Sequence, residues 1–237
     1  MAIWVGTSGY NYPEWKGSFY PEKLPASQML AYYAERLSTV EINYTYYRMP
    51  NTKTLESWKI ATPERYKLTL KAPKRITHDA RLKDCADHVR YFTEIAARLG
   101  PKLGALLFQL PPYLKKDLDV FDKFLETLPS GICAAFEFRH GSWLVDEVYD
   151  RLRARNLALC VADSQTMTTP LVTTADYAYF RLRDEGYTGE DIARWAAMIR
   201  EQDASRREVY VYFKHEEEGK GPQFARALLE RLAQASP

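Results

Sequence analysis

Residues 133–164, CAAFEFRHGSWLVDEVYDRLRARNLALCVADS, contain two apolar, strand-like runs joined by a segment with helical periodicity. The runs cover residues 133–140 and 157–164, and VDEVYDRLRARN lies between them. Runs that are apolar almost throughout are typical of strands buried on both faces of a parallel sheet. The stretch therefore predicts a strand–helix–strand unit of an α/β fold.

The same alternation extends over all 237 residues of the chain. Runs rich in β-branched, aromatic and aliphatic residues recur eight times, at 3–9, 39–48, 66–74, 103–112, 133–140, 157–164, 177–184 and 208–216. The sixth connection, QTMTTPLVTTA, is too short and too Thr-rich for a full helix. The pattern predicts a (β/α)8 barrel of the TIM type, one domain over residues 1–237, with an irregular sixth connection. A doubly wound sheet is the weaker alternative, because VGTSGYNYPEW lacks the GxGxxG fingerprint.

Composition and charge narrow the class of protein. The chain is 46% hydrophobic and 27% charged, which is ordinary for a globular protein, and its formal charge of +2 is too small to indicate nucleic-acid or membrane binding. The cysteines, at 85, 133 and 160, form no CxxC pair and are expected as small core residues. Because no secretory signal or apolar run of about 20 residues is evident, we expect a cytoplasmic protein without a membrane partner.

Charged residues interrupt the apolar run at 133–140. Side chains two residues apart share a face of a strand, so Phe136 and Phe138 are expected to face the helices while Glu137 and Arg139 face the barrel axis. The same parity predicts inward polar residues on each of the seven remaining strands: Ser8, Glu41, Asn43, Lys71, Gln109, Asp163, Arg181, Arg183, Tyr212 and Lys214. We therefore predict a site at the carboxyl-terminal mouth, where barrel enzymes place their active sites.

Structural ion pairs are the alternative interpretation of these residues. A buried charge is costly unless it is paired and hydrogen-bonded, so some members of the set are expected to close the top of the core instead of touching a ligand. Glu41 is the deepest in its strand, and we expect it to be a buried partner of Lys71 or Arg139.

Several segments resemble the signature segments of the YecE-like family, also catalogued as domain of unknown function 72. They are GTSGYNYPEWKGSFYP, TVEINYTYYRMP, ITH, LGALLFQLPP, AFEFRHGSW and YVYFK, and the likeness runs from Trp4 to about Leu229. The resemblance implies a (β/α)8 barrel but no particular reaction. It also implies recurring polar positions at Ser8, Glu41, Asn43, Tyr47, Lys71, His78, Gln109, Glu137, Arg139, His140, Trp143 and Arg181.

Two departures from the family pattern raise the positive charge of the predicted mouth. Relatives usually carry His-Gly where this chain has Arg183-Asp184, and an Asn pair where it has Lys214-His215. Lys and Arg then outnumber Asp and Glu among the predicted site residues. Since Arg and Lys bind phosphate and carboxylate groups, we expect a small anionic substrate. Its predicted binding residues are Ser8, Tyr10, Glu41, Asn43, Tyr47, His78, Gln109, Arg139, Trp143, Asp163, Arg181 and Lys214.

The catalytic candidates are Glu137, His140 and Lys71. Glu137 is the first choice for acid–base chemistry, with Arg139 setting its pKa, and a histidine can exchange a proton near neutral pH. Lys71 or Lys214 could also form a Schiff base in a desolvated site. No cofactor is indicated. A metal held by Glu41, Glu137, Asp163, His140 and His215 is disfavoured, because no HxH or HExxH spacing occurs and cations lie nearby.

Other readings remain open. Bare backbone N–H groups near Gly219 and Gly221 suit an anion at a helix start, but a simple flexible turn is the alternative, and the acidic run at 216–218 opposes an anion there. Aromatic residues near the entrance could wall the pocket or, together with Lys16, Lys74, Arg75 and Arg81, stack exposed bases of a nucleic acid. Half of them could instead cover the first helix and the rim of the barrel. These aromatic residues are Tyr10, Tyr12, Trp15, Tyr44, Tyr46, Tyr47 and Trp143. The function expected is thus an enzyme acting on a small anion without a metal, and the alternatives are a nucleic-acid-binding protein and a ligand-binding barrel without turnover.

Overall fold

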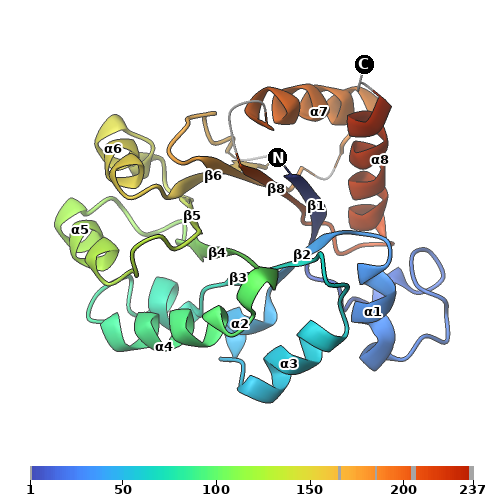
Figure 1. Cartoon of the computed structure of the whole chain (residues 1–237). Coiled ribbons are helices and arrows are strands. Elements are labelled where there is room, and N and C mark those ends of the chain that lie inside the picture. The colour runs from blue at the N-terminus through green and yellow to red at the C-terminus, as the bar shows by residue number, and fades with distance from the viewer. Residues whose placement is uncertain (1, 165–166, 185, 204–206, 235–237) are drawn as a thin grey trace.

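Eight parallel strands close into a barrel in the computed structural model, which describes residues 2–164, 167–184, 186–203 and 207–234. Each strand pairs with the next one in the chain, and β8 pairs with β1 (Figure 1). The strands are β1 Ala2–Ser8, β2 Thr39–Ile42, β3 Lys67–Lys71, β4 Leu103–Gln109, β5 Ala134–Glu137, β6 Ala158–Asp163, β7 Tyr177–Leu182 and β8 Glu208–Phe213. The predicted (β/α)8 barrel is confirmed.

The helices surround the barrel (Figure 1). They are α1 Met29–Ala34, α2 Tyr44–Tyr47, α3 Thr52–Ile60, α4 Ala86–Ala97, α5 Leu118–Glu126, α6 Asp146–Ala154, α7 Gly189–Asp203 and α8 Lys220–Gln234. Short helical turns occupy Pro13–Trp15, Ala26–Gln28, Arg75–Asp79, Gly100–Lys102 and Gly141–Trp143. In the sixth connection, the described residues 164 and 167–176 form no helix, as the Thr-rich sequence predicts. No helix within the described ranges is long and apolar enough to cross a membrane.

Seven of the eight strands are shorter than the apolar runs that predict them, and β1 is as long as its run. The clearest case is β2, which ends at Ile42, so residues 44–47 form the helix α2 instead of continuing the strand. Thr45 stabilises this turn, because its hydroxyl donates to the carbonyl oxygens of Ile42 (3.1 Å) and Lys71 (2.6 Å). The tyrosines of this segment are thereby brought to the barrel mouth.

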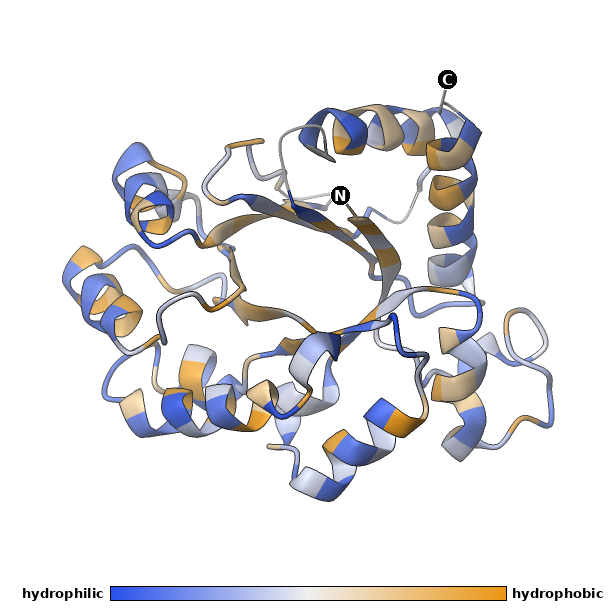
Figure 2. Cartoon of the chain, in the orientation of Figure 1, coloured by the Kyte–Doolittle hydropathy of each residue, from blue (hydrophilic) through white to orange (hydrophobic). Residues whose placement is uncertain are grey.

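Two apolar layers form the core. The outer layer lies between strands and helices, where Phe108 and Phe136 of the sheet pack against Phe121 and Phe124 of α5. The inner layer fills the barrel with Trp4, Ala105, Leu107, Ala135, Ala158, Cys160, Ala175, Tyr177, Tyr179, Tyr210 and Tyr212. Strand ribbons are mostly hydrophobic, while the helices carry hydrophobic and hydrophilic residues along their length (Figure 2).

Tyrosines fill the interior where barrels usually carry branched aliphatic residues. Each buried hydroxyl then requires a partner. Tyr212 Oη lies 2.8 Å from Thr39 Oγ1 and 2.7 Å from Thr69 Oγ1, and Tyr177 Oη donates to the carbonyl oxygen of Ala134. The inner layer is therefore partly a hydrogen-bonded network, and it continues into the polar groups at the mouth.

Candidate functional site

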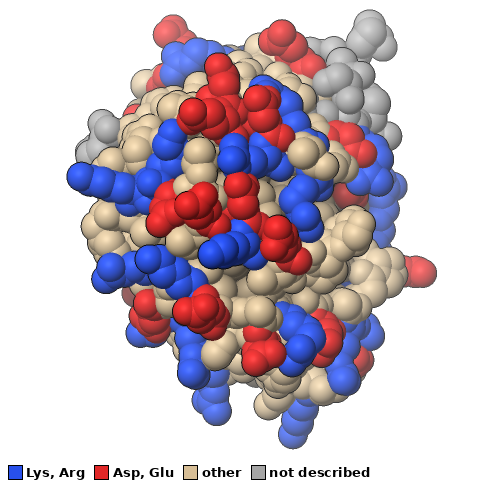
Figure 3. All heavy atoms as spheres, turned by 90° about the vertical axis from the view of Figure 1, so that its left-hand side faces the viewer, with Lys and Arg blue, Asp and Glu red and all other residues tan. Residues whose placement is uncertain are grey.

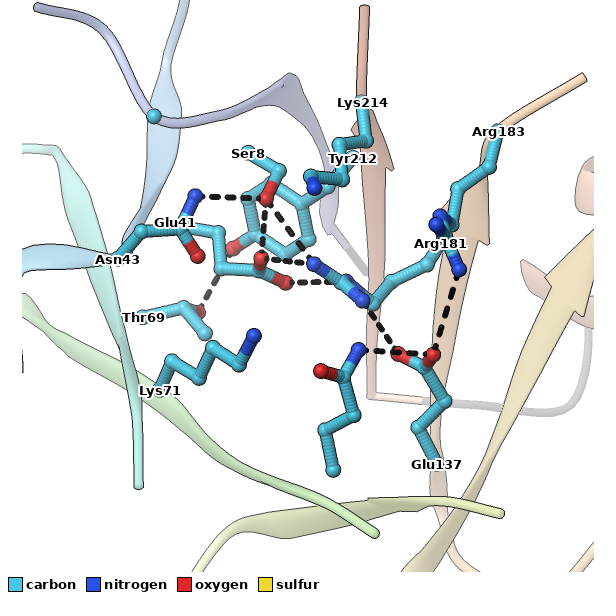
Figure 4. Close-up of polar contacts among 12 residues, drawn as sticks. Ser8, Glu41, Asn43, Thr69, Lys71, Glu137, Arg181, Arg183, Tyr212 and Lys214 are labelled. Atoms are coloured by element: carbon cyan, nitrogen blue, oxygen red, sulfur yellow. Dashed lines mark hydrogen bonds and ion pairs between the residues drawn. The ribbon is translucent and has the colours of Figure 1, made fainter. Parts of the chain in front are cut away.

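Arg181 of β7 lies at the centre of the polar groups and is fully buried. Its Nε donates to Glu41 Oε2 (2.9 Å) and its Nη2 to Glu41 Oε1 (2.8 Å). Nη1 donates to Glu137 Oε2, and Nη2 also donates to Ser8 Oγ (3.1 Å) (Figure 4). One guanidinium thus connects β7 with β1, β2 and β5.

The two carboxylates are saturated with donors. Ser8 Oγ (2.5 Å) and Tyr179 Oη also donate to Glu41, while Gln109 Nε2 (2.9 Å) and Arg139 Nε (2.8 Å) donate to Glu137. Burial opposes their ionisation, but the charge of Arg181 and the hydrogen bonds outweigh it, so the pKa of each carboxyl is lowered. The prediction that Glu41 pairs with Lys71 or Arg139 is wrong, because the guanidinium of Arg181 donates to both oxygens of Glu41.

Lys71, on the inward face of β3, points into the centre of the site without a dashed contact in Figure 4. Among the described residues, its ammonium group forms no ion pair, and it lies 4.3 Å from the centroid of the Tyr46 ring. Burial and the neighbouring charge of Arg181 outweigh the opposing effect of Glu41 and Glu137 and lower the pKa of Lys71 to about 7. The amine therefore changes charge near neutral pH.

A cavity of about 580 Å³ opens at the mouth, and its charged lining residues are Lys71, Lys214 and Glu216. Its lining comprises Gly9, Tyr10, Asn11, Tyr12, Ile42, Asn43, Tyr44, Tyr46, Tyr47, Thr54, Trp58, Lys71, Lys214 and Glu216. A neighbouring cavity of about 260 Å³ is lined by Arg183, Lys214, His215, Glu216, Glu217 and Lys220. Lys214 and Glu216 line both cavities and separate them.

The predicted site residues divide into two groups by depth. Tyr10, Asn43, Tyr47, Lys71 and Lys214 line the larger cavity. A deeper group is buried in the network around Arg181 and consists of Ser8, Glu41, Gln109, Glu137 and Arg181 itself. These five buried residues lie beneath the mouth.

The remaining predicted residues lie at the edges of this arrangement. Arg139 keeps 26% of its side chain exposed beside Glu137. His78 packs edge-on against Tyr46, at 5.1 Å between ring centroids, and burial lowers its pKa. His140 Nδ1 accepts from the backbone N–H of Ser142 (3.2 Å), and His140 is not among the residues that line the larger cavity.

Asp163 does not face the mouth, so that prediction is wrong. On β6, Ala158 and Cys160 belong to the inner layer, whereas Leu159 and Val161 belong to the outer one. Asp163 shares the parity of the outer residues, and its Oδ2 accepts from Tyr187 Oη (2.8 Å). β6 therefore contributes the small Ala162 to the inner face in place of a carboxylate.

The predicted pocket position of Trp143 is also wrong, and Trp15 does not line the larger cavity either. Trp143 is 1% exposed, stacks on Phe138 with ring centroids 4.9 Å apart, and donates from Nε1 to the carbonyl oxygen of Leu114 (2.8 Å). Trp15 is fully buried and donates from Nε1 to the carbonyl oxygen of Glu216 (2.9 Å). Both indoles pack in the core behind the barrel wall.

Sequence reasoning missed several residues at the site, of which Tyr179 and Trp58 bear most on its chemistry. Tyr179 lies two positions before Arg181, so strand parity could have placed it inside the barrel beside Glu41. Trp58 lines the larger cavity from α3, where helical periodicity alone marks it as a core residue. Gly221 was read as part of an anion site, but a Cβ there would come 2.8 Å from the His215 carbonyl oxygen, so close packing explains this glycine.

Within the described part of the chain, no group of three or more His, Cys, Asp or Glu side chains is placed to hold a metal ion. Both Glu41 and Glu137 already accept hydrogen bonds from Arg181. The fold and site therefore define a (β/α)8 barrel with a lysine-bearing cavity at the carboxyl ends of its strands.

The chain belongs to the family described as protein of unknown function DUF72, which matches residues 4–237. The UPF0759 protein YecE of Escherichia coli strain K12 is 29% identical over 139 residues, which are 58% of this chain and 48% of that protein. The chain thus aligns with about half the length of the curated relatives it matches. The predicted YecE-like resemblance is confirmed.

Solved structures of the same family share the fold. A DUF72 protein from Thermotoga maritima is 29% identical, with a TM-score of 0.83 over 98% of this chain and 100% of that one. A DUF72 protein from Enterococcus faecalis is 18% identical, with a TM-score of 0.82 over 99% and 97% of the two chains. The second likeness concerns the fold alone.

Proposed function

We propose that the chain is an enzyme that performs acid–base chemistry on a small anionic substrate, without a metal ion, and that Lys71 exchanges the proton. One observation carries the proposal: an amine that forms no ion pair among the described residues lines a cavity of about 580 Å³. Its pKa of about 7 lets it both accept and donate a proton at neutral pH. A non-catalytic ligand-binding barrel is the alternative.

The contacts of the other candidates favour Lys71 over them. Glu137 is 1% exposed and accepts hydrogen bonds on both oxygens, and its lowered pKa makes it a poor proton donor. Its role in the proposal is electrostatic: with Glu41 it holds Arg181 in place, and Arg181 lowers the pKa of Lys71. His140 is held by Ser142 and lies outside the cavity lining.

The anionic substrate is inferred from the charges around the cavity. Lys214 lines it together with Glu216, 3.6 Å away. Arg139 and Arg183 lie outside its lining, and they share the carboxylate of Glu137 with Arg181. These cations exceed their carboxylate partners, so a phosphate or carboxylate at the mouth meets an attractive field. The outer face around α5 and α6 differs, because Lys and Arg alternate there with Asp and Glu (Figure 3) in pairs such as Arg151–Asp122.

The test measures the titration of Lys71 and the binding of anions. Acetylation rates of individual lysines, followed by mass spectrometry across pH, should place the midpoint of Lys71 near neutral pH, and the exposed Lys53 serves as the reference lysine outside the cavity. Inorganic phosphate, ribose 5-phosphate and citrate should be screened for a rise in melting temperature. Turnover of any ligand found should vanish in Lys71→Met and persist in Lys53→Met.

Three results would count against the proposal. If Lys71 titrates at the ordinary lysine pKa of 10.5, the amine is not available as a base at neutral pH. If none of the three anions changes the melting temperature, the substrate class is wrong. Binding without turnover for every ligand that binds would favour the non-catalytic barrel.

A further inference from the structure

One side of the larger cavity is a wall of aromatic rings. Tyr10 and Tyr12 come from the loop after β1, while the others come from α2 and α3; the rings are those of Tyr10, Tyr12, Tyr44, Tyr46, Tyr47 and Trp58. Tyr44 packs edge-on against Trp58 at 6.2 Å, and Tyr46 against Tyr47 at 4.9 Å. Tyr44 and Tyr47 are 44% and 77% exposed. Exposed rings beside a cavity offer faces on which a planar group can stack.

A buried acceptor lies next to this wall. Asn43 lines the cavity, its Nδ2 donates to Ser8 Oγ (3.0 Å), and its Oδ1 is buried without a hydrogen-bond partner. Leaving a buried carbonyl oxygen unpaired costs free energy, which a donor on a ligand would recover. The amide and imide N–H groups of heterocyclic rings are donors of this kind.

The same cavity also carries cationic side chains. Lys71 Nζ lies 4.3 Å from the centroid of the Tyr46 ring, so the amine and the aromatic wall share one surface. Lys214 brings a second cation to the same cavity. The volume of about 580 Å³ falls within the range of about 300–1,000 Å³ typical of small-molecule sites.

We infer that the substrate is a planar heterocyclic ring that carries an anionic group, the chemistry of a nucleoside phosphate. The ring stacks on Tyr44 and Tyr47, a ring N–H donates to Asn43 Oδ1, and the anionic group meets Lys214. This inference rests on the proposed function, since it names the substrate class of the same cavity. The ring could belong to a free nucleotide or to the end of a single strand, and the test separates these two sources.

The experiment is calorimetric titration of the whole chain with four probes: uridine 5′-monophosphate, uridine, ribose 5-phosphate and a short oligothymidylate. The monophosphate should bind about tenfold more tightly than ribose 5-phosphate, because stacking of a base on aromatic side chains contributes affinity of that order. The double variant Tyr44→Ala/Tyr47→Ala should remove that difference. The matched control is Tyr91→Ala, a tyrosine on α4 that is 53% exposed and outside the cavity lining, and it should preserve the difference.

The outcomes separate the two proposals. Equal affinity for the monophosphate and ribose 5-phosphate would overturn the ring inference and leave the anionic substrate intact. Equal affinity for uridine and its monophosphate would support the ring and refute the anion. Tighter binding of the oligothymidylate, weakening steeply with salt, would support the ring and assign it to a nucleic acid strand. If none of the four probes binds, both proposals fail.

Discussion

Arg181 donates two hydrogen bonds to Glu41 from the opposite part of the barrel, since the first lies on β7 and the second on β2. Both side chains are 0% exposed. The mutual attraction of such a pair must offset the cost of removing two charges from water. Glu137 adds a second carboxylate to the same guanidinium, so the cluster around Arg181 is a tightly coupled unit whose members depend on one another.

Arg181→Met should strongly destabilise the chain, because it leaves Glu41 and Glu137 buried without their main counter-charge. Breaking a buried pair typically costs about 3–5 kcal/mol, and urea unfolding measures the change in the free energy of unfolding. Arg194→Met is the control. Arg194 forms an ion pair with Asp191, and the side chain of Arg194 is 64% exposed. Exposed ion pairs contribute about 1 kcal/mol or less to stability. Equal losses in the two variants would contradict a stabilising role for the buried cluster.

Acid should destabilise the chain through the same carboxylates. The pKa of Glu41 and of Glu137 is lowered below the ordinary value of 4.5. As the pH falls past 4.5, the unfolded state therefore binds more protons than the folded state. Their stabilisation is therefore complete above about pH 5 and declines steadily below it. Urea unfolding at several acidic pH values should show a shallower decline in Glu137→Gln than in the natural chain. A parallel decline would mean that Glu137 titrates normally.

Lys71→Met should stabilise the chain at neutral pH. Folded Lys71 releases its proton at a pKa of about 7, whereas the unfolded side chain holds it up to 10.5, so between these values the unfolded state binds more protons. The stability of the natural chain thus rises with pH across this window, and the advantage of the variant, about 1 kcal/mol or more near pH 7, should shrink toward pH 10. Melting temperatures of both proteins across that range test this, and a constant difference would refute the lowered pKa.

Tyr212→Phe should destabilise the interior of the barrel. The change removes the hydroxyl that lies 2.8 Å from Thr39 Oγ1 and 2.7 Å from Thr69 Oγ1. Two buried hydrogen bonds are thereby lost. A loss of about 1–3 kcal/mol in the free energy of unfolding is expected. Tyr113→Phe, at a tyrosine that is 59% exposed, should change stability by less than about 0.5 kcal/mol. Indistinguishable variants would mean that the interior hydroxyl network does not stabilise the fold.

Local patterns in the sequence were sufficient for the barrel and for most of its inward-facing polar residues. Strand-like runs alternate with helical segments, and the parity of each strand correctly directs Glu41, Lys71, Glu137 and Arg181 toward the axis. The inward side of a strand can be predicted because burial repeats every two residues and is therefore visible in a short stretch of sequence. Asp163 is the exception, because the alternation along β6 turns Ala158 and Cys160 inward and places Asp163 with the outer residues Leu159 and Val161.

The sequence by itself thus determined the fold, the family and the inward side of most strands, because these depend on periodicity and on short motifs. The tertiary structure alone decided that Arg181, and neither Lys71 nor Arg139, binds Glu41, that Trp143 packs against Phe138, and that Trp58 reaches the cavity. These contacts join residues far apart in the chain, and their distances depend on how the closed barrel sets the register of its strands. The charge of Lys71 follows from the same closure, because burial and the nearby Arg181 lower its pKa.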